Sequence, residues 1–200
     1  RLENLRNMYS YVFQDVFLFS DTIGSNISFG AGDRGNRLEY NGQYDGQRRR
    51  RGYDEQYVRR MAAIAGADGF ISSMPDGYDT VVGERGVGLS GGQKQRLSLA
   101  RALADNPSIL IMDDTTSAVD METEAEIQRH LRDLDEKKTI VTIAHRISSV
   151  KDSDLILVLE HGRIVERGTH DELVASHGRY WQIYSKQLGV DAGRSQGFEA

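Results

Sequence analysis

Residues 89–96 have the types and spacing that a phosphate-binding turn requires. The segment reads Leu-Ser-Gly-Gly-Gln-Lys-Gln-Arg. Its adjacent glycines, Gly91 and Gly92, let the backbone approach a ligand without a Cβ in the way, and Ser90 adds a hydroxyl. Apolar residues then follow at helical spacing, and the amides at a helix N-terminus favour an anion. Taken alone, a Ser-Gly-Gly turn is more often simply the start of a helix.

Two adjacent carboxylates, Asp113 and Asp114, follow an apolar run at residues 109–112. Ligands of open α/β sheets bind beyond the carboxyl ends of the strands. A carboxylate there can hold Mg²⁺ directly or through water. The alternative is a pair of helix-capping acids before the turn at residues 115–118.

His145 follows a second apolar run, at residues 139–143. We expect it to emerge at the same sheet edge as Asp113, within reach of a phosphate. A lone histidine is more often structural, so its position in the sequence is what favours a functional role.

Short buried strands are predicted to position these side chains. Aliphatic or β-branched runs without alternation occupy residues 108–112, 139–143 and 155–159. This pattern is typical of strands covered on both faces, as in a parallel sheet. After the turn at residues 161–162, residues 163–166 are predicted to form an antiparallel strand.

Helices are predicted around these strands from apolar spacing and capping residues. The strand-helix-strand order predicts an α/β sheet. The residues that carry these predictions are Val58, Met61, Ala62 and Ala65, then Ile127, Leu131 and Leu134, the pair Thr169 and Glu172, and residues 178–188 with Tyr180, Trp181 and Tyr184.

Composition excludes several classes of protein. With 25 Lys and Arg against 30 Asp and Glu, the net charge is −5, which argues against an electrostatic nucleic-acid binder. The absence of cysteine excludes disulfide scaffolds and thiolate metal sites. No apolar run approaches the roughly 20 residues of a membrane-spanning helix, so we expect this chain itself to be soluble. It starts at Arg1 without a signal-like segment, which suggests a fragment.

Residues 33–56 break the pattern of apolar elements, because they are rich in glycine and include four consecutive arginines. One interpretation is a basic finger that contacts phosphates or lipid headgroups. We favour a solvated insertion loop, since its arginines are offset by acidic residues and loops tolerate long insertions.

In this order, the motifs resemble those of the nucleotide-binding domain of an ATP-binding cassette (ABC) transporter of the exporter type. Residues 89–96 match the family's signature motif, residues 109–114 its Walker B strand, and residues 117–120 its D-loop. His145 matches the switch histidine, and residues 11–20 resemble the Q-loop with Gln14 as its glutamine. Residues 26–30 and 83–86 also fit the exporter pattern.

The resemblance implies a P-loop NTPase-like α/β fold, in which helices flank a parallel β-sheet core and an α-helical subdomain carries the signature. Residues 1–188 would form part of that domain. The helical subdomain would span about residues 15–105, including the insertion at 33–56, and the core with Walker B, the D-loop and the switch histidine would span 106–188. Residues 189–200 would be a flexible tail.

The resemblance also implies roles for single residues in ATP hydrolysis with Mg²⁺. Asp113 would hold Mg²⁺ through water, Asp114 would orient the attacking water, and His145 would stabilise the γ-phosphate. Gln14 would sense Mg²⁺ and the γ-phosphate. The remaining assignments are nucleotide binding by Ser90, Gly91, Gly92, Gln93 and Asp120, and contact with the membrane domains by Phe17, Phe19, Glu84 and Arg85.

The implied partners are a second nucleotide-binding domain and the transmembrane domains of the same transporter, with no nucleic acid. The signature of one domain completes the ATP site of the other. The location would be the cytoplasmic face of the cell membrane, as part of an integral membrane transporter.

Two departures from the family pattern qualify these roles. The sequence has no G-x-x-x-x-G-K-[ST] motif, so the main triphosphate cradle is absent from this polypeptide, and truncation is the simplest explanation. We expect the chain alone to be a poor ATPase. Asp114 stands where hydrolytic members carry Glu, and a misplacement of about 1 Å can cost roughly 10²-fold in rate.

These departures favour the degenerate half of a heterodimeric exporter, although a homodimer in which Asp114 supports adequate hydrolysis is the alternative. A non-hydrolysing module that regulates dimer closure is a second function. A DNA-repair or chromosome-organising ABC ATPase is disfavoured because the chain shows neither heptads nor a basic face. An importer ATPase is disfavoured by the tyrosine-rich C-terminal helix and by residues 16–20.

Overall fold

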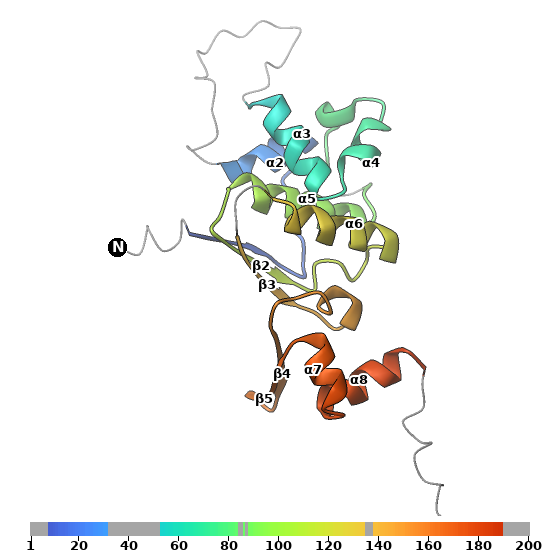
Figure 1. The fold of residues 1–200 in the computed structure, drawn as a ribbon. Coiled ribbons are helices and arrows are strands. Elements are labelled where there is room, and N and C mark those ends of the chain that lie inside the picture. The colour runs from blue at the N-terminus through green and yellow to red at the C-terminus, as the bar shows by residue number, and fades with distance from the viewer. Residues whose placement is uncertain (1–7, 32–52, 84–85, 87, 135–137, 190–200) are drawn as a thin grey trace, which may run out of the picture. The chain divides into compact units, whose positions relative to one another are not determined.

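The computed structural model describes residues 8–31, 53–83, 86, 88–134 and 138–189 (Figure 1). The chain divides into two units, Arg1–Ile143 and Ala144–Ala200, and each is described by itself.

A parallel sheet lies at the centre of the first unit. Its strands are β1 (Tyr9–Val12), β2 (Ile109–Asp113) and β3 (Thr139–Ile143), with β2 in the middle. In the register, Val12 pairs with Met112 and Asp113 pairs with Ile143. All three strands therefore end at one edge, as the prediction of a parallel α/β sheet requires.

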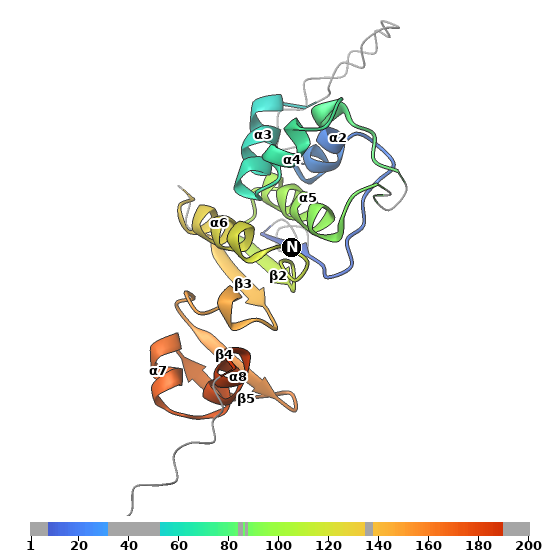
Figure 2. The same ribbon diagram turned by 90° about the vertical axis from the view of Figure 1, so that its right-hand side faces the viewer.

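Helices form the rest of the first unit. They are α2 (Ile23–Ser28), η1 (Phe29–Ala31), α3 (Glu55–Ile64), α4 (Asp68–Ser72), η2 (Gly77–Asp79), α5 (Gly91–Ala104) and α6 (Met121–Arg132). Figures 1 and 2 show α5 and α6 on the same side of the sheet. Leu97, Leu103, Leu110 and Ile127 are almost completely buried between these elements. The helices predicted from apolar spacing around Met61 and Ile127 are confirmed.

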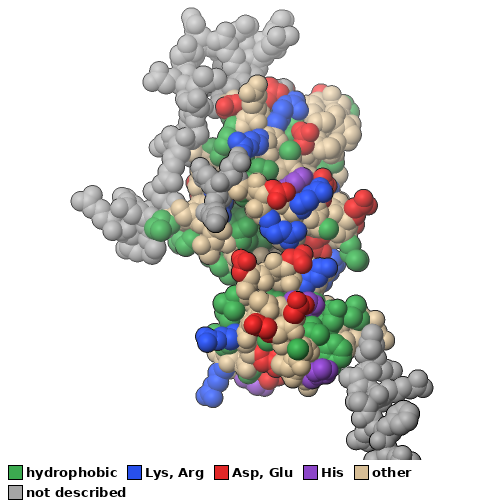
Figure 3. Space-filling model, in the orientation of Figure 1, with side chains coloured by type: hydrophobic (Ala, Val, Ile, Leu, Met, Phe, Trp, Pro, Cys, Tyr) green, Lys and Arg blue, Asp and Glu red, His purple; other side chains and the backbone are tan. Residues whose placement is uncertain are grey.

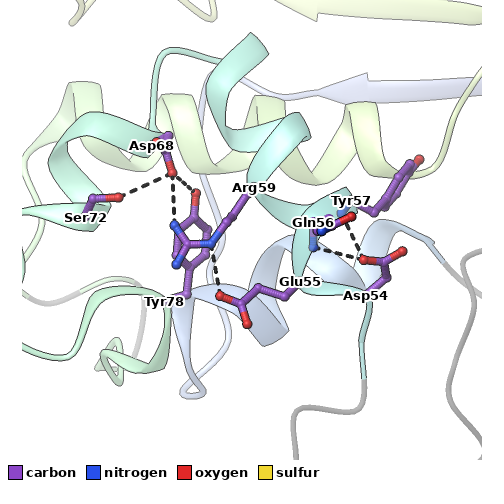
Figure 4. Close-up of polar contacts among 8 residues, drawn as sticks. All are labelled: Asp54, Glu55, Gln56, Tyr57, Arg59, Asp68, Ser72 and Tyr78. Atoms are coloured by element: carbon purple, nitrogen blue, oxygen red, sulfur yellow. Dashed lines mark hydrogen bonds and ion pairs between the residues drawn. The ribbon is translucent and has the colours of Figure 1, made fainter.

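Polar contacts join α3, α4 and η2 (Figure 4). Asp54 caps α3 by accepting hydrogen bonds from the amides of Gln56 and Tyr57. The Tyr78 hydroxyl donates to Asp68 Oδ1 at 2.6 Å, and the guanidinium of Arg59 lies 4.6 Å from the centre of the Tyr78 ring. The buried aromatic ring and its hydrogen bond hold these short helices together better than the ion pairs of Arg59, which is half exposed.

The prediction that both faces of the strands are covered is wrong for β3. Val141 and Ile143 are 44% and 47% exposed, whereas Leu110 and Met112 of β2 are buried. The reason is that α5 and α6 cover one face of the sheet, and no described element covers the other side of β3. Its aliphatic side chains are thus left at the surface.

The second unit is a hairpin packed on two helices. Strands β4 (Ile156–Glu160) and β5 (Arg163–Gly168) pair in antiparallel fashion, and η4 (Ile147–Ser149), α7 (His170–Ala175) and α8 (Arg179–Gln187) complete it. The antiparallel strand, the capping box of Thr169 and Glu172, and the last helix are confirmed.

The strand predicted at residues 155–159 is confirmed as β4. The prediction that both of its faces are covered, as in a parallel sheet, is wrong, because β4 is half exposed and its only partner among the described strands is antiparallel. Ile156 and Val158 are buried, but Leu157 and Leu159 are 45% and 66% exposed. A single small core lies under the hairpin, built with Leu173 and Tyr180, and it covers one face of β4.

Acidic and basic side chains are interspersed over the face in Figure 3. Among the helices of the described residues, none has both the length and the apolarity needed to cross a bilayer. Residues 33–52 of the segment predicted to be an insertion loop (33–56) lie outside the described residues, as do residues 190–200 of the predicted tail. The prediction is wrong for the end of that segment, because Asp54 caps α3 and Glu55 and Gln56 belong to this helix.

Candidate functional site

Residues 90–93, here called the glycine turn, begin helix α5. Ser90 is the N-cap: its Oγ accepts a hydrogen bond from the amide of Gln93 at 3.2 Å, and Gln93 Oε1 accepts one from the amide of Ser90 at 2.9 Å. This reciprocal capping confirms that the turn starts a helix. Ser90 and Gly91 are exposed at the positive end of a 14-residue helix. A role in phosphate binding stays a prediction.

The glycine turn contacts the segment that follows the paired carboxylates, residues 114–119, here called the acidic turn. Gly92 is buried, and a Cβ at its position would lie 2.7 Å from the carbonyl oxygen of Ala118. Glycine is therefore needed at position 92 for a close contact within the protein itself, whether or not the turn also binds a ligand. Both predicted parts of the site thus belong to one packed body.

Asp113 is the last residue of β2 and is half-buried. Its Oδ2 accepts a hydrogen bond of 2.8 Å from the hydroxyl of Tyr11 on β1. This bond raises the pKa of Tyr11, so the phenol stays protonated and remains a donor at neutral pH. No described residue donates a hydrogen bond to the other carboxylate oxygen of Asp113, Oδ1.

The carboxylates fit a magnesium ion that is shared with a bound phosphate. Mg²⁺ is usually held by one or two carboxylates together with waters and substrate phosphates. Within the described ranges there is no group of three or more acidic, histidine or cysteine side chains able to hold a metal by themselves. Asp113, with one oxygen engaged by Tyr11, suits this sparse kind of site.

Asp114 begins the acidic turn in a left-handed backbone conformation, with φ of 46°. Its amide donates to the carbonyl of Ile143 at 2.8 Å, and its carbonyl accepts from Ser117 Oγ at 3.0 Å. Asp and Asn adopt this conformation more readily than most residues. The aspartate thus suits the backbone of the turn.

The alternative that Asp113 and Asp114 are helix-capping acids is wrong. Helix α6 is capped by Asp120, which accepts hydrogen bonds from the amide and the hydroxyl of Thr123 at 2.9 and 2.8 Å. These bonds lower the pKa of Asp120. Asp120 therefore has a structural role, and its contact with nucleotide stays a prediction.

Gln14 and His145 each lie two residues beyond a strand. Gln14 follows β1 and is exposed. His145 follows β3, is the second residue of the second unit, and has an exposed side chain. Its carbonyl accepts a hydrogen bond from Gln187 Nε2 at 2.7 Å. Their catalytic roles stay predictions.

Phe17 and Phe19 form a surface aromatic cluster with Phe29. The rings of Phe17 and Phe19 are 5.3 Å apart, and Phe19 and Phe29 are 4.6 Å apart. Phe17 and Phe29 are 56% and 63% exposed, and with Phe13 and Arg101 they line a pocket of about 500 Å³. Exposed apolar groups gathered in this way are typical of an interaction surface.

Two polar residues hold this cluster in place. Buried Asn26 donates to the carbonyl of Phe19 at 3.0 Å and accepts from its amide at 2.9 Å. Arg101 donates to the carbonyl of Phe17 at 2.8 Å and to Asn26 Oδ1 at 2.6 Å. Burial lowers the pKa of Arg101 to about 10, which still leaves it charged at neutral pH.

Comparison with known families decides the identity of this arrangement. The family described as "ABC transporter" matches residues 1–117, more than half of the chain. The chain belongs to the ABC transporter family. The match includes Gln14, the glycine turn, Asp113 and Asp114, whereas Asp120 and His145 lie beyond it.

Similar proteins agree with this family. An ATP-dependent lipid A-core flippase of Aliivibrio fischeri is 43% identical over 189 residues, which are 94% of this ABC transporter chain and 29% of the relative. The uncharacterized ABC transporter ATP-binding protein YknU of Bacillus subtilis is 49% identical over 186 residues, which are 93% of this chain and 28% of the relative. The chain thus spans less than a third of the length of these relatives.

A solved structure has the same fold. It is a bacterial Atm1-family ABC exporter with ATP bound, 41% identical, with a TM-score of 0.78, and the alignment covers 94% of this ABC transporter chain and 30% of that one. The prediction of an α/β fold like that of an ABC ATPase domain, with a parallel sheet and flanking helices, is confirmed. Glu84 and Arg85, predicted to contact the membrane domains, lie outside the described residues.

Four residues that support the candidate site in this ABC transporter chain were not predicted from the sequence. Tyr11 contacts Asp113, Gln95 contacts the acidic turn, and Asn26 and Arg101 hold the aromatic cluster. A signal existed for Gln95, since it lies at i+3 from Gly92 and i−4 from Leu99, on the buried face of α5. A polar residue on such a face needs a partner.

Proposed function

We propose that this chain is the ATP-binding and ATP-hydrolysing part of an ABC exporter. The observation that carries the proposal is the direct packing of the glycine turn against the acidic turn, at Gly92 and Ala118. One rigid contact thereby joins a helix N-terminus suited to phosphate with the carboxylates that end a parallel strand.

The proposed reaction is phosphoryl transfer from ATP to water, in which catalysis is mostly positioning and charge stabilisation. Asp113 would hold Mg²⁺ through water, Asp114 would orient the attacking water, and His145 would stabilise the γ-phosphate. Gln14 would sense Mg²⁺ and the γ-phosphate. When bound, Mg²⁺ neutralises charge that develops on the phosphate oxygens.

The glycine turn acts on a second nucleotide-binding domain. Ser90, Gly91, Gly92 and Gln93 close on the nucleotide that the partner domain holds, and Asp120 lies in the segment that faces that partner. ATP then joins two domains across their interface, at the cytoplasmic face of the membrane.

The aromatic cluster transmits closure to the membrane domains. Phe17 and Phe19 provide an exposed apolar contact, and Glu84 and Arg85 are proposed to contact the membrane domains as well. Support for this role comes from the exposure of the rings, together with the buried Asn26 and the half-buried Arg101, which bond the backbone of Phe19 and Phe17.

The presence of Asp at position 114 favours the proposal that this chain's own site hydrolyses ATP slowly and that the chain belongs to a heterodimer. Its carboxylate is shorter than that of Glu by one CH₂ group, which leaves the attacking water poorly placed. The partner's site, completed by the intact glycine turn of this chain, would then perform most of the hydrolysis. Under this second function, the chain's own site binds nucleotide mainly to regulate closure of the dimer.

The test uses the assembled transporter that contains this chain. Ser90→Arg should abolish ATP turnover, because a bulky cation blocks the glycine turn from the partner's nucleotide. Ser72→Arg, an exposed serine at the end of α4, is the matched control and should leave turnover unchanged. Normal turnover in Ser90→Arg would refute the proposal.

A further inference from the structure

Gln95 links the glycine turn to the acidic turn through both ends of its amide. It lies one turn into α5 and is 7% exposed. Its Oε1 accepts a hydrogen bond from the amide of Ala118 at 3.1 Å, and its Nε2 donates to Ser117 Oγ at 3.2 Å. A weaker contact joins Nε2 to the carbonyl of Asp114 at 3.4 Å.

These bonds support the unusual backbone of Asp114. A non-glycine residue at positive φ persists when surrounding contacts hold it. Ser117 Oγ donates to the carbonyl of Asp114 at 3.0 Å and receives a hydrogen bond from Gln95. Gln95 therefore orients the hydroxyl that holds the carbonyl, and it also contacts that carbonyl itself.

The close approach of the two turns leaves little freedom for them to move apart. Gly92 packs on Ala118, and the amide of Ala118 is bonded to Gln95, three residues further along the same helix. A shift of the start of α5 must therefore shift residues 117–118 as well, or break these bonds.

We infer that Gln95 is a positioning residue that makes the glycine turn and the acidic turn move as one body. Closure of the glycine turn on the partner's nucleotide then sets the backbone of Asp114 in this chain's own site, so Gln95 links the two ATP sites of a dimer. This role rests on the proposed function. A purely structural Gln95 would affect folding but not turnover at saturating ATP.

The experiment compares Gln95→Met with the unaltered protein in the assembled transporter. Met keeps the approximate length of the side chain but neither donates nor accepts the hydrogen bonds described above. Gln128→Met on α6, a half-buried glutamine of the same unit, is the matched control. Gln95→Glu is the second variant if Gln95→Met does not assemble, because it keeps an acceptor for Ala118 and loses the donor.

The first measurement is hydrogen exchange without nucleotide in the peptide that covers residues 114–119. We expect exchange about three-fold or more faster in Gln95→Met, because local opening becomes easier, and unchanged exchange in Gln128→Met. Equal exchange in Gln95→Met and the unaltered protein would overturn the inference. This measurement needs no ATP, so its result does not depend on whether the proposed function is correct.

The second measurement is steady-state ATP hydrolysis. For Gln95→Met we expect kcat about ten-fold lower, with KM for ATP within about two-fold and the melting temperature unchanged, because both Asp114 and the glycine turn that completes the partner's site are slightly misplaced. Unchanged kcat despite faster exchange would overturn the positioning role. Absence of hydrolysis in the unaltered transporter would instead count against the proposed function.

Discussion

The hydroxyl of Tyr11 lies 2.8 Å from Asp113 Oδ2, although the two residues are 102 positions apart in the sequence. In the register of the parallel strands, Tyr11 pairs with Ile111, two residues before Asp113. Side chains two residues apart on a strand share a face, so the long phenol reaches the carboxylate diagonally. One carboxylate oxygen is thereby held by the neighbouring strand.

Replacing Tyr11 by Phe should lower the apparent affinity for Mg²⁺ in ATP turnover. Loss of one hydrogen bond to a carboxylate should raise the Mg²⁺ concentration needed for half-maximal turnover by about five-fold, measured by ATPase titration of the assembled transporter. Tyr9→Phe, on the exposed start of the same strand, should change nothing. An identical magnesium requirement in Tyr11→Phe would show that the bond does not orient Asp113 for the metal.

Asp114→Glu should raise ATP turnover at this chain's own site by about ten-fold or more, because the longer side chain reaches the attacking water. The left-handed backbone at φ of 46° favours Asp over Glu, so we also expect a small loss of stability, about 1 kcal/mol. Turnover and thermal unfolding are measured together. Asp171→Glu in the first turn of α7 is the control. If turnover stays the same, the slow-site proposal fails.

Gly92→Ala should destabilise the protein, whereas Gly91→Ala should not. A Cβ at Gly92 would lie 2.7 Å from the Ala118 carbonyl oxygen, whereas one at Gly91 would lie 3.4 Å from the Ala118 Cβ, an ordinary contact. We expect Gly92→Ala to cost about 1–3 kcal/mol, seen as a lower melting temperature. Equal melting temperatures for the two variants would contradict the packing of the two turns.

Asn26→Ala should unfold more easily and should disturb the aromatic cluster. The buried amide side chain bonds the backbone of Phe19 and the guanidinium of Arg101. Its loss leaves the Phe19 amide without its partner and removes one hydrogen bond each from the Phe19 carbonyl and from Arg101, at a cost of about 2–4 kcal/mol. Denaturant unfolding measures this cost. Ser28→Ala in the same helix, which removes one hydrogen bond to the backbone, is expected to cost under about 1 kcal/mol. A cost for Asn26→Ala no larger than for Ser28→Ala would contradict the prediction.

The second unit should lose stability in alkali through Tyr180. Burial raises the pKa of Tyr180 from 10.0 to about 12, so the folded form keeps the phenol proton more tightly than the unfolded form. The resulting stability is complete below pH 10 and is lost as the pH rises to about 12. Fluorescence of Trp181, the only tryptophan, follows unfolding of this unit.

Tyr180→Phe should remove most of that alkaline loss, even though it also removes the hydrogen bond to His170 Nδ1. Tyr184→Phe should still lose stability at alkaline pH. A Tyr180→Phe variant that unfolds over the same pH range would assign the alkaline transition to other groups.

The sequence by itself determined the local elements and the order of the motifs. Apolar spacing predicted α3 and α6, the Ser-Gly-Gly turn predicted the start of α5, and the capping box of Thr169 and Glu172 predicted the start of α7. The Ser-Gly-Gly and Asp-Asp segments also identified the family. These features depend on residues a few positions apart, where helix geometry and capping chemistry act directly.

Only the tertiary structure decided which faces are covered and which distant groups meet. Runs of similar composition became the covered β2 and the half-exposed β3 and β4, because the packing of helices is not a property of the strand itself. The contacts of Tyr11 with Asp113 and of Gln95 with Ala118 depend on strand register and on a close approach at Gly92. Such contacts join residues far apart in the sequence, so no local pattern specifies them.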